Sequence, residues 1–264
     1  MDKTSSASVV GLPRTLHIPA RRIGYMLIAV IGLLLAAQIA VLVLKYTFGN
    51  GYAWGLAGLF RMNSEANIPA LTSAMLILSC GVVALLSGGL QARSGRDRLP
   101  WLLLGAVMIF LAYDEGARLH EQIGDTMHAR LNADWLPDYA FLLPYGAAML
   151  VLAIVLIPWF FRLDRASQIL FVAAGTIFVT GAAGFEILER EHLLAVGQTE
   201  SALTDVTVTI EETLELSGMA LFLFAMVKRL GGLTVSSTSQ PVAATARPAD
   251  SYAASDTIRE TSAA

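Results

Sequence analysis

Acidic and imidazole side chains break into the apolar segments of this chain at three places that are far apart in sequence. Carboxylate oxygens and imidazole nitrogens together form the donor sets of Mn, Fe and Zn sites in proteins. These residue types therefore indicate a divalent metal ion, with zinc, manganese and iron left open. The residues expected to hold it are Asp114, Glu115, His120, Glu121, Glu186, Glu189, His192, Glu212 and Glu215.

One of the three places carries a recognisable spacing. Glu189 and His192 form a Glu-x-x-His pair, the arrangement that di-metal carboxylate helix bundles use. That pattern requires a second such pair on another helix, whereas the first place offers only the adjacent His120 and Glu121. The spacing therefore favours a metal site without specifying the di-iron type.

The elements that must position these residues follow from the apolar blocks. Hydrophobic residues make up 55% of the 264 residues and charged residues only 15%, and blocks of about twenty apolar residues are long enough to cross a bilayer. The sequence predicts an all-α, polytopic transmembrane bundle of six helices, in contact with the lipid bilayer. The expected helices cover about 23–44, 69–91, 139–161, 167–192 and 206–227, with a third helix in the chain that begins at Pro100.

Composition sets further bounds on the chain. A net charge of −3 gives no basis for binding nucleic acid, and the single cysteine, Cys80, excludes a disulfide framework. The expected organisation is a polar cytoplasmic segment at 1–22, the helical domain at 23–229, and a disordered cytoplasmic tail, rich in Ser, Thr and Ala, at 230–264.

Arginine and lysine clusters decide the expected orientation. They lie before the first expected helix and after the second, fourth and sixth, and positive charge collects on the cytoplasmic side. The chain is therefore expected in the cell's inner membrane with both termini in the cytoplasm. All three acidic places then lie toward the outer face, where the deeper carboxylates stand inside the hydrocarbon layer.

Charges at that depth need a compensating interaction. Each charged residue near the bilayer centre costs about 2.5–3.5 kcal/mol on insertion scales. Protonation of a structural carboxyl network, pairing with Arg118 and Arg190, or a bound cation would each offset this cost. Helical spacing predicts an Asp114–Arg118 pair on an unbroken helix. Elsewhere, Gln38 is expected to form a helix–helix hydrogen bond and Asp205 to cap a helix.

The chain also resembles a known group of proteins over about residues 50–228. The stretch 61–69, the Asp114-Glu115 and His120-Glu121 pairs, and the Glu-Glu-x-x-Glu motif at 211–215 are similar to those of an uncharacterised family of bacterial multi-pass membrane proteins. The resemblance implies no activity. A looser similarity to alkaline ceramidase-type membrane hydrolases lacks their late His-x-x-x-His pair and seventh helix. Additional site residues to consider are Glu65, Asn67, Arg118 and Glu211.

Three functions fit these features. The first is a metal-dependent membrane enzyme that acts on a small molecule or a lipid. The second is a proton- or cation-coupled transporter or channel, since acids and histidines inside a membrane often mark ion paths. The third is a non-catalytic sensor or assembly factor. The sequence gives no oligomeric state, and it leaves open whether Glu65 and Asn67 join the site or serve as a loop acid and a cap.

Overall fold

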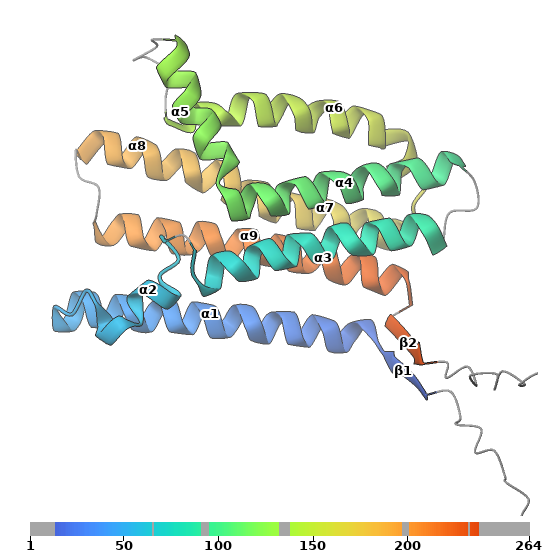
Figure 1. The fold of residues 1–264 in the computed structure, drawn as a ribbon, viewed down its shortest axis with the longest axis horizontal. Helices are drawn as coiled ribbons and strands as arrows, with labels where there is room; N and C mark the ends of the chain where they lie inside the picture. Colours follow the sequence, from blue (N-terminus) through green and yellow to red (C-terminus); the bar gives the residue numbers. More distant parts are fainter. Residues whose placement is uncertain are drawn as a thin grey trace, which may run out of the picture. The chain divides into compact units, whose positions relative to one another are not determined.

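The computed structural model describes the chain over residues 14–64, 66–90, 95–131, 138–196, 201–231 and 233–237. The chain divides into two units. Residues His17–Thr234 form one unit, which holds every helix of the described part (Figure 1). Met1–Leu16 and Val235–Ala264 form the other. An all-α architecture is therefore confirmed.

The helices follow the apolar blocks closely. The long ones are α1 Ala20–Phe48, α3 Ile68–Leu90, α4 Gly95–Ala117, α5 Leu119–Leu131, α6 Leu142–Phe160, α7 Arg165–Val179, α8 Glu186–Val196 and α9 Ala202–Arg229. Short elements are the 3-10 turns η1 Ala53–Gly55 and η2 Asp138–Phe141, the four-residue α2 Ala57–Phe60, and η3 Thr180–Phe185, a π-helix between α7 and α8.

Within the described residues, five helical segments are long and apolar enough to cross a membrane. They are Ala20–Phe48, Ile68–Gly89, Gly95–Ala117, Leu142–Phe160 and the continuous Arg165–Leu193. The sixth expected helix, α9, is 28 residues long but is not among them. Its first half carries Glu211, Glu212 and Glu215, which lower its apolar character.

Two local features differ from the sequence-based expectations. Helix α4 begins at Gly95, so Pro100 lies inside the helix and not in its first turn. The polar stretch after α4 is not one unbroken helix, because Arg118 has φ +55 and separates α4 from α5. That left-handed conformation is uncommon outside glycine. The unbroken helix on which an Asp114–Arg118 pair is expected is therefore interrupted at Arg118.

Two short strands were also not expected. β1 Arg14–Ile18 and β2 Leu233–Ser237 are hydrogen-bonded neighbours in a two-stranded sheet. β2 occupies the start of the tail that the sequence analysis assigned to disorder, and the strand-favouring Thr234 and Val235 account for this. The rest of the tail lies outside the described residues.

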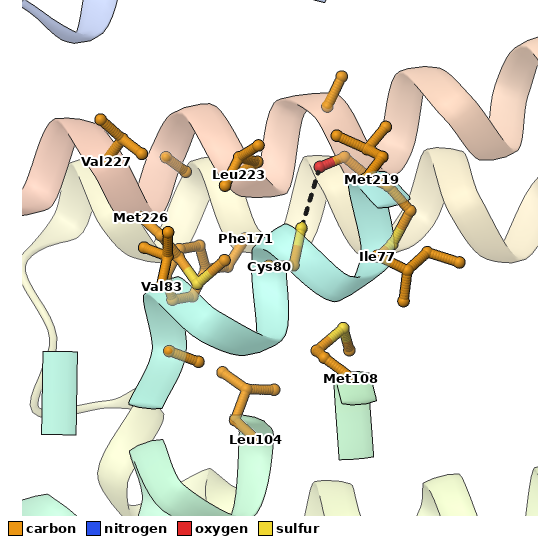
Figure 2. Close-up of a cluster of buried hydrophobic side chains, with 14 of the residues drawn as sticks. Ile77, Cys80, Val83, Leu104, Met108, Phe171, Met219, Leu223, Met226 and Val227 are labelled. Carbon is orange, nitrogen blue, oxygen red and sulfur yellow. Dashed lines mark hydrogen bonds between the residues drawn. The ribbon is translucent and has the colours of Figure 1, made fainter. Parts of the chain in front are cut away.

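An apolar core joins α3, α4, α7 and α9. Figure 2 shows Cys80 in this core, where its thiol donates to the backbone oxygen of Met219 at 3.6 Å. Close contact needs small residues: a Cβ on Gly218 would stand 2.7 Å from the backbone nitrogen of Phe178. Helices α7 and α9 therefore pack backbone against backbone, as small residues allow in membrane bundles.

The three acidic places lie at one end of the helical unit, although ion pairs occur at both ends. In Figure 1 the end of α4, all of α8 and the first half of α9 lie in the left half of the view. The end of α3, the α6–α7 connection and the end of α9 lie at the right. Basic residues Arg96, Arg162 and Arg229 belong to this second end. The arrangement brings the three acidic places to the same half of the helical unit.

Candidate metal site

Three carboxylates from two helices meet in the acidic half. One carboxylate oxygen from each of Glu186, Glu189 and Glu211 lies within 4.8 Å of the others. Glu189 and Glu211 are buried, with 8% and 9% of their surface exposed. Oxygens at this separation are close enough to bind one cation together. The sequence indicates Glu211 only as an additional site residue, whereas the geometry places it in this cluster.

One oxygen of the cluster has no internal partner. Glu211 Oε2 is fully buried and forms no hydrogen bond to any described residue. The nearest groups in this cluster are the carboxylates of Glu186 and Glu189. A bound cation would supply the partner that Glu211 Oε2 lacks.

The π-helix η3 leads directly into this cluster. Its first and last residues are Thr180 and Phe185, and Glu186 begins α8. Gly181 within it packs against α9: a Cβ there would stand 2.8 Å from the backbone oxygen of Glu211 and 3.0 Å from Glu215 Cγ. The absence of a side chain lets α8 start against α9. π-Helical turns of this kind are frequent at functional sites.

Further expected acids lie on the same helix and on α4. Glu212 and Glu215 follow Glu211 on α9, and Glu115 lies near the end of α4. Among the described residues, only Glu186, Glu189 and Glu211 have oxygens close enough for one ion. Glu115, Glu212 and Glu215 therefore lie outside this three-residue group.

The first acidic place forms a separate contact set. Asp114 is buried and its Oδ1 accepts hydrogen bonds from the backbone N–H of His120 at 2.8 Å and from the Tyr145 hydroxyl at 2.7 Å. Its Oδ2 lies 3.2 Å from His120 Nδ1. The left-handed turn at Arg118 brings α5 back over Asp114. Tyr145 was missed, because nothing in its sequence context distinguishes it from an interface tyrosine.

The remaining expected residues have other placements. His192 is half-buried on α8 and does not belong to the three-oxygen group. Asn67 accepts from the backbone N–H of Ala70 at 3.0 Å, so it caps α3. The side chain of Glu121 and the whole of Glu65 lie outside the described residues, as does the side chain of Arg190.

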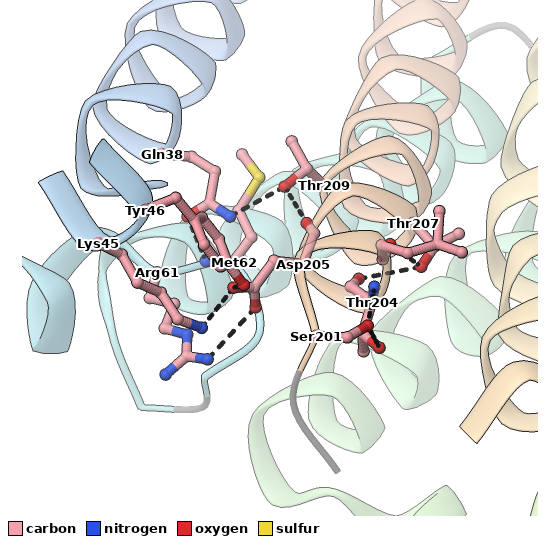
Figure 3. Close-up of polar contacts among 11 residues, drawn as sticks. Gln38, Lys45, Tyr46, Arg61, Met62, Ser201, Thr204, Asp205, Thr207 and Thr209 are labelled. Atoms are coloured by element: carbon pink, nitrogen blue, oxygen red, sulfur yellow. Dashed lines mark hydrogen bonds and ion pairs between the residues drawn. The ribbon is translucent and has the colours of Figure 1, made fainter. Parts of the chain in front are cut away.

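A second buried acid on α9 has a different environment (Figure 3). Asp205, with 1% of its surface exposed, binds Lys45 Nζ at 2.5 Å, the Tyr46 hydroxyl at 2.7 Å and Arg61 Nη2 at 3.3 Å. The expectation that Asp205 caps a helix is wrong. Ser201 is the cap, and its Oγ accepts from Thr204 N at 3.0 Å.

The pKa of Asp205, which lies just before the expected span at 206–227, follows from this network. Burial alone would raise it, but the hydrogen bonds from Lys45 and Tyr46 and the charges of Lys45 and Arg61 outweigh burial. The pKa of Asp205 is therefore held below its ordinary value. The carboxylate is a charged link between α1, Arg61 just after α2, and α9.

Gln38 strengthens the same link. Its Nε2 donates to Thr209 Oγ1 at 2.9 Å, and its Oε1 accepts from the backbone N–H of Met62 at 3.1 Å. The predicted helix–helix hydrogen bond of Gln38 is confirmed. The network around Asp205 is thus a structural clamp in which the acid and the amide both find their partners inside the protein.

Comparison with known proteins places the chain in a family. The model of the family described as "Domain of unknown function (DUF8692)" matches residues 26–230, so the chain belongs to this family. The matched segment runs from α1 through α9, and the expected membership of an uncharacterised family is confirmed. No curated protein and no solved structure matches the chain.

Proposed function

We propose that this member of the DUF8692 family is an integral membrane protein that binds a divalent cation between α8 and α9 and uses it in a metal-assisted reaction. In this proposal α9 crosses the membrane over about 206–227 as a sixth span, because the 28 residues of the helix exceed the roughly 20 needed to cross. Both termini then face the cytoplasm and the site faces the outer side of the inner membrane.

The buried Glu211 oxygen carries the proposal. A polar oxygen removed from water without a partner costs about 1–3 kcal/mol, and Glu211 Oε2 is such an oxygen among the described residues. It stands in a group whose other members, Glu186 and Glu189, present carboxylate oxygens within 4.8 Å. A cation bound by the three would supply the missing interaction.

The donor set favours a hard cation. Three carboxylates offer only oxygen, and oxygen ligands suit Mn²⁺, Mg²⁺ and Ca²⁺ better than zinc, which favours nitrogen and sulfur. The sequence leaves zinc, manganese and iron open, and of these manganese is the ion that oxygen ligands also favour. We therefore take Mn²⁺ as the first ion to test.

The apolar core supports a reaction over conduction. Cys80, Val83, Leu104, Leu223 and Met226 pack together in the apolar core of the bundle (Figure 2). An ion crossing this region would lose its hydration without polar replacement. A bound metal at the glutamates could polarise water or a substrate oxygen. A small molecule or a lipid is the substrate class we propose.

Elemental analysis of the protein purified in nanodiscs, after equilibration with Mn²⁺ and removal of free ion, tests the proposal. Wild type is expected to retain close to one ion, and Glu211→Gln to retain none, because the amide removes the charge and keeps the shape. Glu191→Gln is the matched control: Glu191 is an exposed acid on α8. Equal retention in all three proteins, or none in wild type, would contradict the proposal.

A further inference from the structure

The segment between α1 and α3 exposes an uncharged surface that is rich in aromatic rings. Residues 46–60, here called the aromatic segment, contain no charged side chain and run from the last turn of α1 through η1 and α2. The exposed fractions are 70% for Phe48, 74% for Tyr52 and 76% for Trp54, and Leu56 and Leu59 are exposed as well. Exposed apolar surface of this kind marks a contact with another molecule or with a membrane.

The opposite side of the aromatic segment is held by the protein. Ala53 and Ala57 are buried and pack against Val41 of α1. The backbone N–H of Ala53 donates to the Asn50 side chain at 2.9 Å. Figure 1 shows the result, with α2 lying beside the end of α1. The exposed rings therefore extend from a backbone that has defined contacts with the helical unit.

The backbone conformation at two consecutive residues decides which side chain lies outside. Ala53 and Trp54 have φ of +49 and +51, in the left-handed region. That conformation is uncommon for residues other than glycine, and more so for a bulky one. It leaves Ala53 fully buried and the ring of Trp54 exposed. A large apolar ring held outside the core in this way indicates a partner beyond the protein.

We propose that the aromatic segment is an interfacial anchor, with Tyr52 and Trp54 seated in the phospholipid headgroup layer at the end of α1. The segment is continuous with a helix that is long and apolar enough to cross a membrane. Tyrosine and tryptophan are enriched in the headgroup layer, because each has an apolar ring for the acyl chains and a polar group for the water side. A lipid surface also requires no charged residue from the segment.

The length of α1 supports this depth. Its 29 residues extend about 44 Å at about 1.5 Å per residue. A bilayer with its headgroup layers is about 40–45 Å thick. The end of α1 at Phe48, and the aromatic segment that packs beside it, therefore fall at the level of the headgroups.

The anchor goes beyond the proposed function and does not depend on the cation. It is nevertheless connected to the helix that carries Glu211. Arg61 follows α2 directly, and its Nη2 binds Asp205 Oδ1 on α9 at 3.3 Å. The depth of the aromatic segment in the headgroup layer therefore also sets the depth at which α9 begins.

Tryptophan fluorescence of the full chain in phosphatidylcholine vesicles tests the anchor. The chain has 4 tryptophans, and the difference between wild type and Trp54→Phe isolates the emission of Trp54. The lipid is brominated either close to the acyl carbonyl group or near the chain end, and iodide serves as the quencher in water. The Trp54 emission is expected to be quenched more strongly by the shallow bromine than by the deep bromine, and only weakly by iodide.

Two further variants act as reporter and control. Tyr52→Trp in the otherwise unchanged chain is expected to add a second emission with the same shallow quenching, which keeps the test valid if Trp54→Phe folds poorly. Leu150→Trp in the Trp54→Phe background is the depth control. Leu150 is exposed near the middle of α6, so its replacement is expected to show the reverse order of quenching.

Three results would overturn the anchor. Strong quenching of Trp54 by iodide, with none by brominated lipid, would place the ring in water. Protection from both quenchers would place it against protein, such as a second copy of this chain. Stronger quenching by the deep bromine than by the shallow bromine would place it in the hydrocarbon layer.

Discussion

Two buried acids on α9, Asp205 and Glu211, lie less than two helical turns apart and have opposite surroundings. Asp205 accepts from Lys45, Tyr46 and Arg61. Glu211 instead faces Glu186 and Glu189 and keeps one oxygen without a partner in the described structure. Burial costs both carboxylates their hydration, but only at Asp205 does the protein replace it.

This difference separates a structural group from a binding group. A carboxylate matched by cationic and hydroxyl donors stabilises one arrangement of helices. A buried carboxylate close to other carboxylates is unfavourable in its charged form unless a proton or a cation binds to it. The comparison therefore predicts opposite consequences for two chemically similar substitutions on the same helix.

The largest expected effect is on stability. Asp205→Asn removes the counter-charge that Lys45 and Arg61 share and is expected to lower the free energy of unfolding by about 3 kcal/mol. Glu211→Gln removes one charge from an acidic group and is expected to leave metal-free stability unchanged or higher. Thermal unfolding of both variants in nanodiscs measures this. A loss at Glu211→Gln as large as at Asp205→Asn would erase the distinction.

A smaller effect is expected at Gly181. A Cβ there would stand 2.8 Å from the Glu211 backbone oxygen, so Gly181→Ala must push α9 away from η3, at a cost of about 1–3 kcal/mol. Mn²⁺ binding should weaken as well. Gly184→Ala is the control in the same π-helix, because its nearest contact would be an ordinary 3.9 Å. Equal stability and Mn²⁺ affinity in the two variants would show that the close approach does not position the glutamates.

The network around Asp205 also predicts how the stability of the protein depends on pH. Because the pKa of Asp205 is lowered in the folded protein, the native state binds fewer protons than the unfolded state. The contribution of Asp205 to the free energy of unfolding is complete above the pKa of the unfolded state, about 3.9. It is lost as the pH falls through the pKa of the folded state. Melting temperatures measured from pH 7 to pH 3 should therefore decline less steeply in Asp205→Asn than in wild type. Parallel curves would contradict this assignment.

The smallest effect belongs to Tyr46. Its hydroxyl is one of three donors to Asp205, and Tyr46→Phe leaves the two cations in place. The expected loss is about 1 kcal/mol, the usual net value of one hydrogen bond, measured by chemical unfolding. A loss equal to that of Asp205→Asn would mean that the hydroxyl, and not the charges, maintains the clamp.

Sequence patterns predicted the helices well and the site only in part. Apolar blocks of membrane length set most helix boundaries, and an isolated amide at Gln38 correctly indicated a helix–helix bond. The left-handed residue at Arg118 was not predictable, because arginine gives no signal for that conformation. It was this turn that paired Asp114 with His120.

The contacts that sequence patterns did not predict are mostly between residues far apart in the chain. Asp205 contacts residues 160 and 144 positions away in the chain, and no local pattern encodes such a pairing. The π-helix before Glu186 likewise changes which face of α8 meets α9, whereas spacing rules assume 3.6 residues per turn. Glu211 could have been ranked higher from its position one turn before Glu215.

Stabilisation by Mn²⁺ tests the central claim most directly. A ligand at 100 times its dissociation constant adds about 2.7 kcal/mol to the stability of the state that binds it. Mn²⁺ is therefore expected to raise the melting temperature of wild type and of Asp205→Asn by similar amounts, and to leave Glu211→Gln unchanged. If Mn²⁺ stabilises Glu211→Gln as much as wild type, the three glutamates do not form the site.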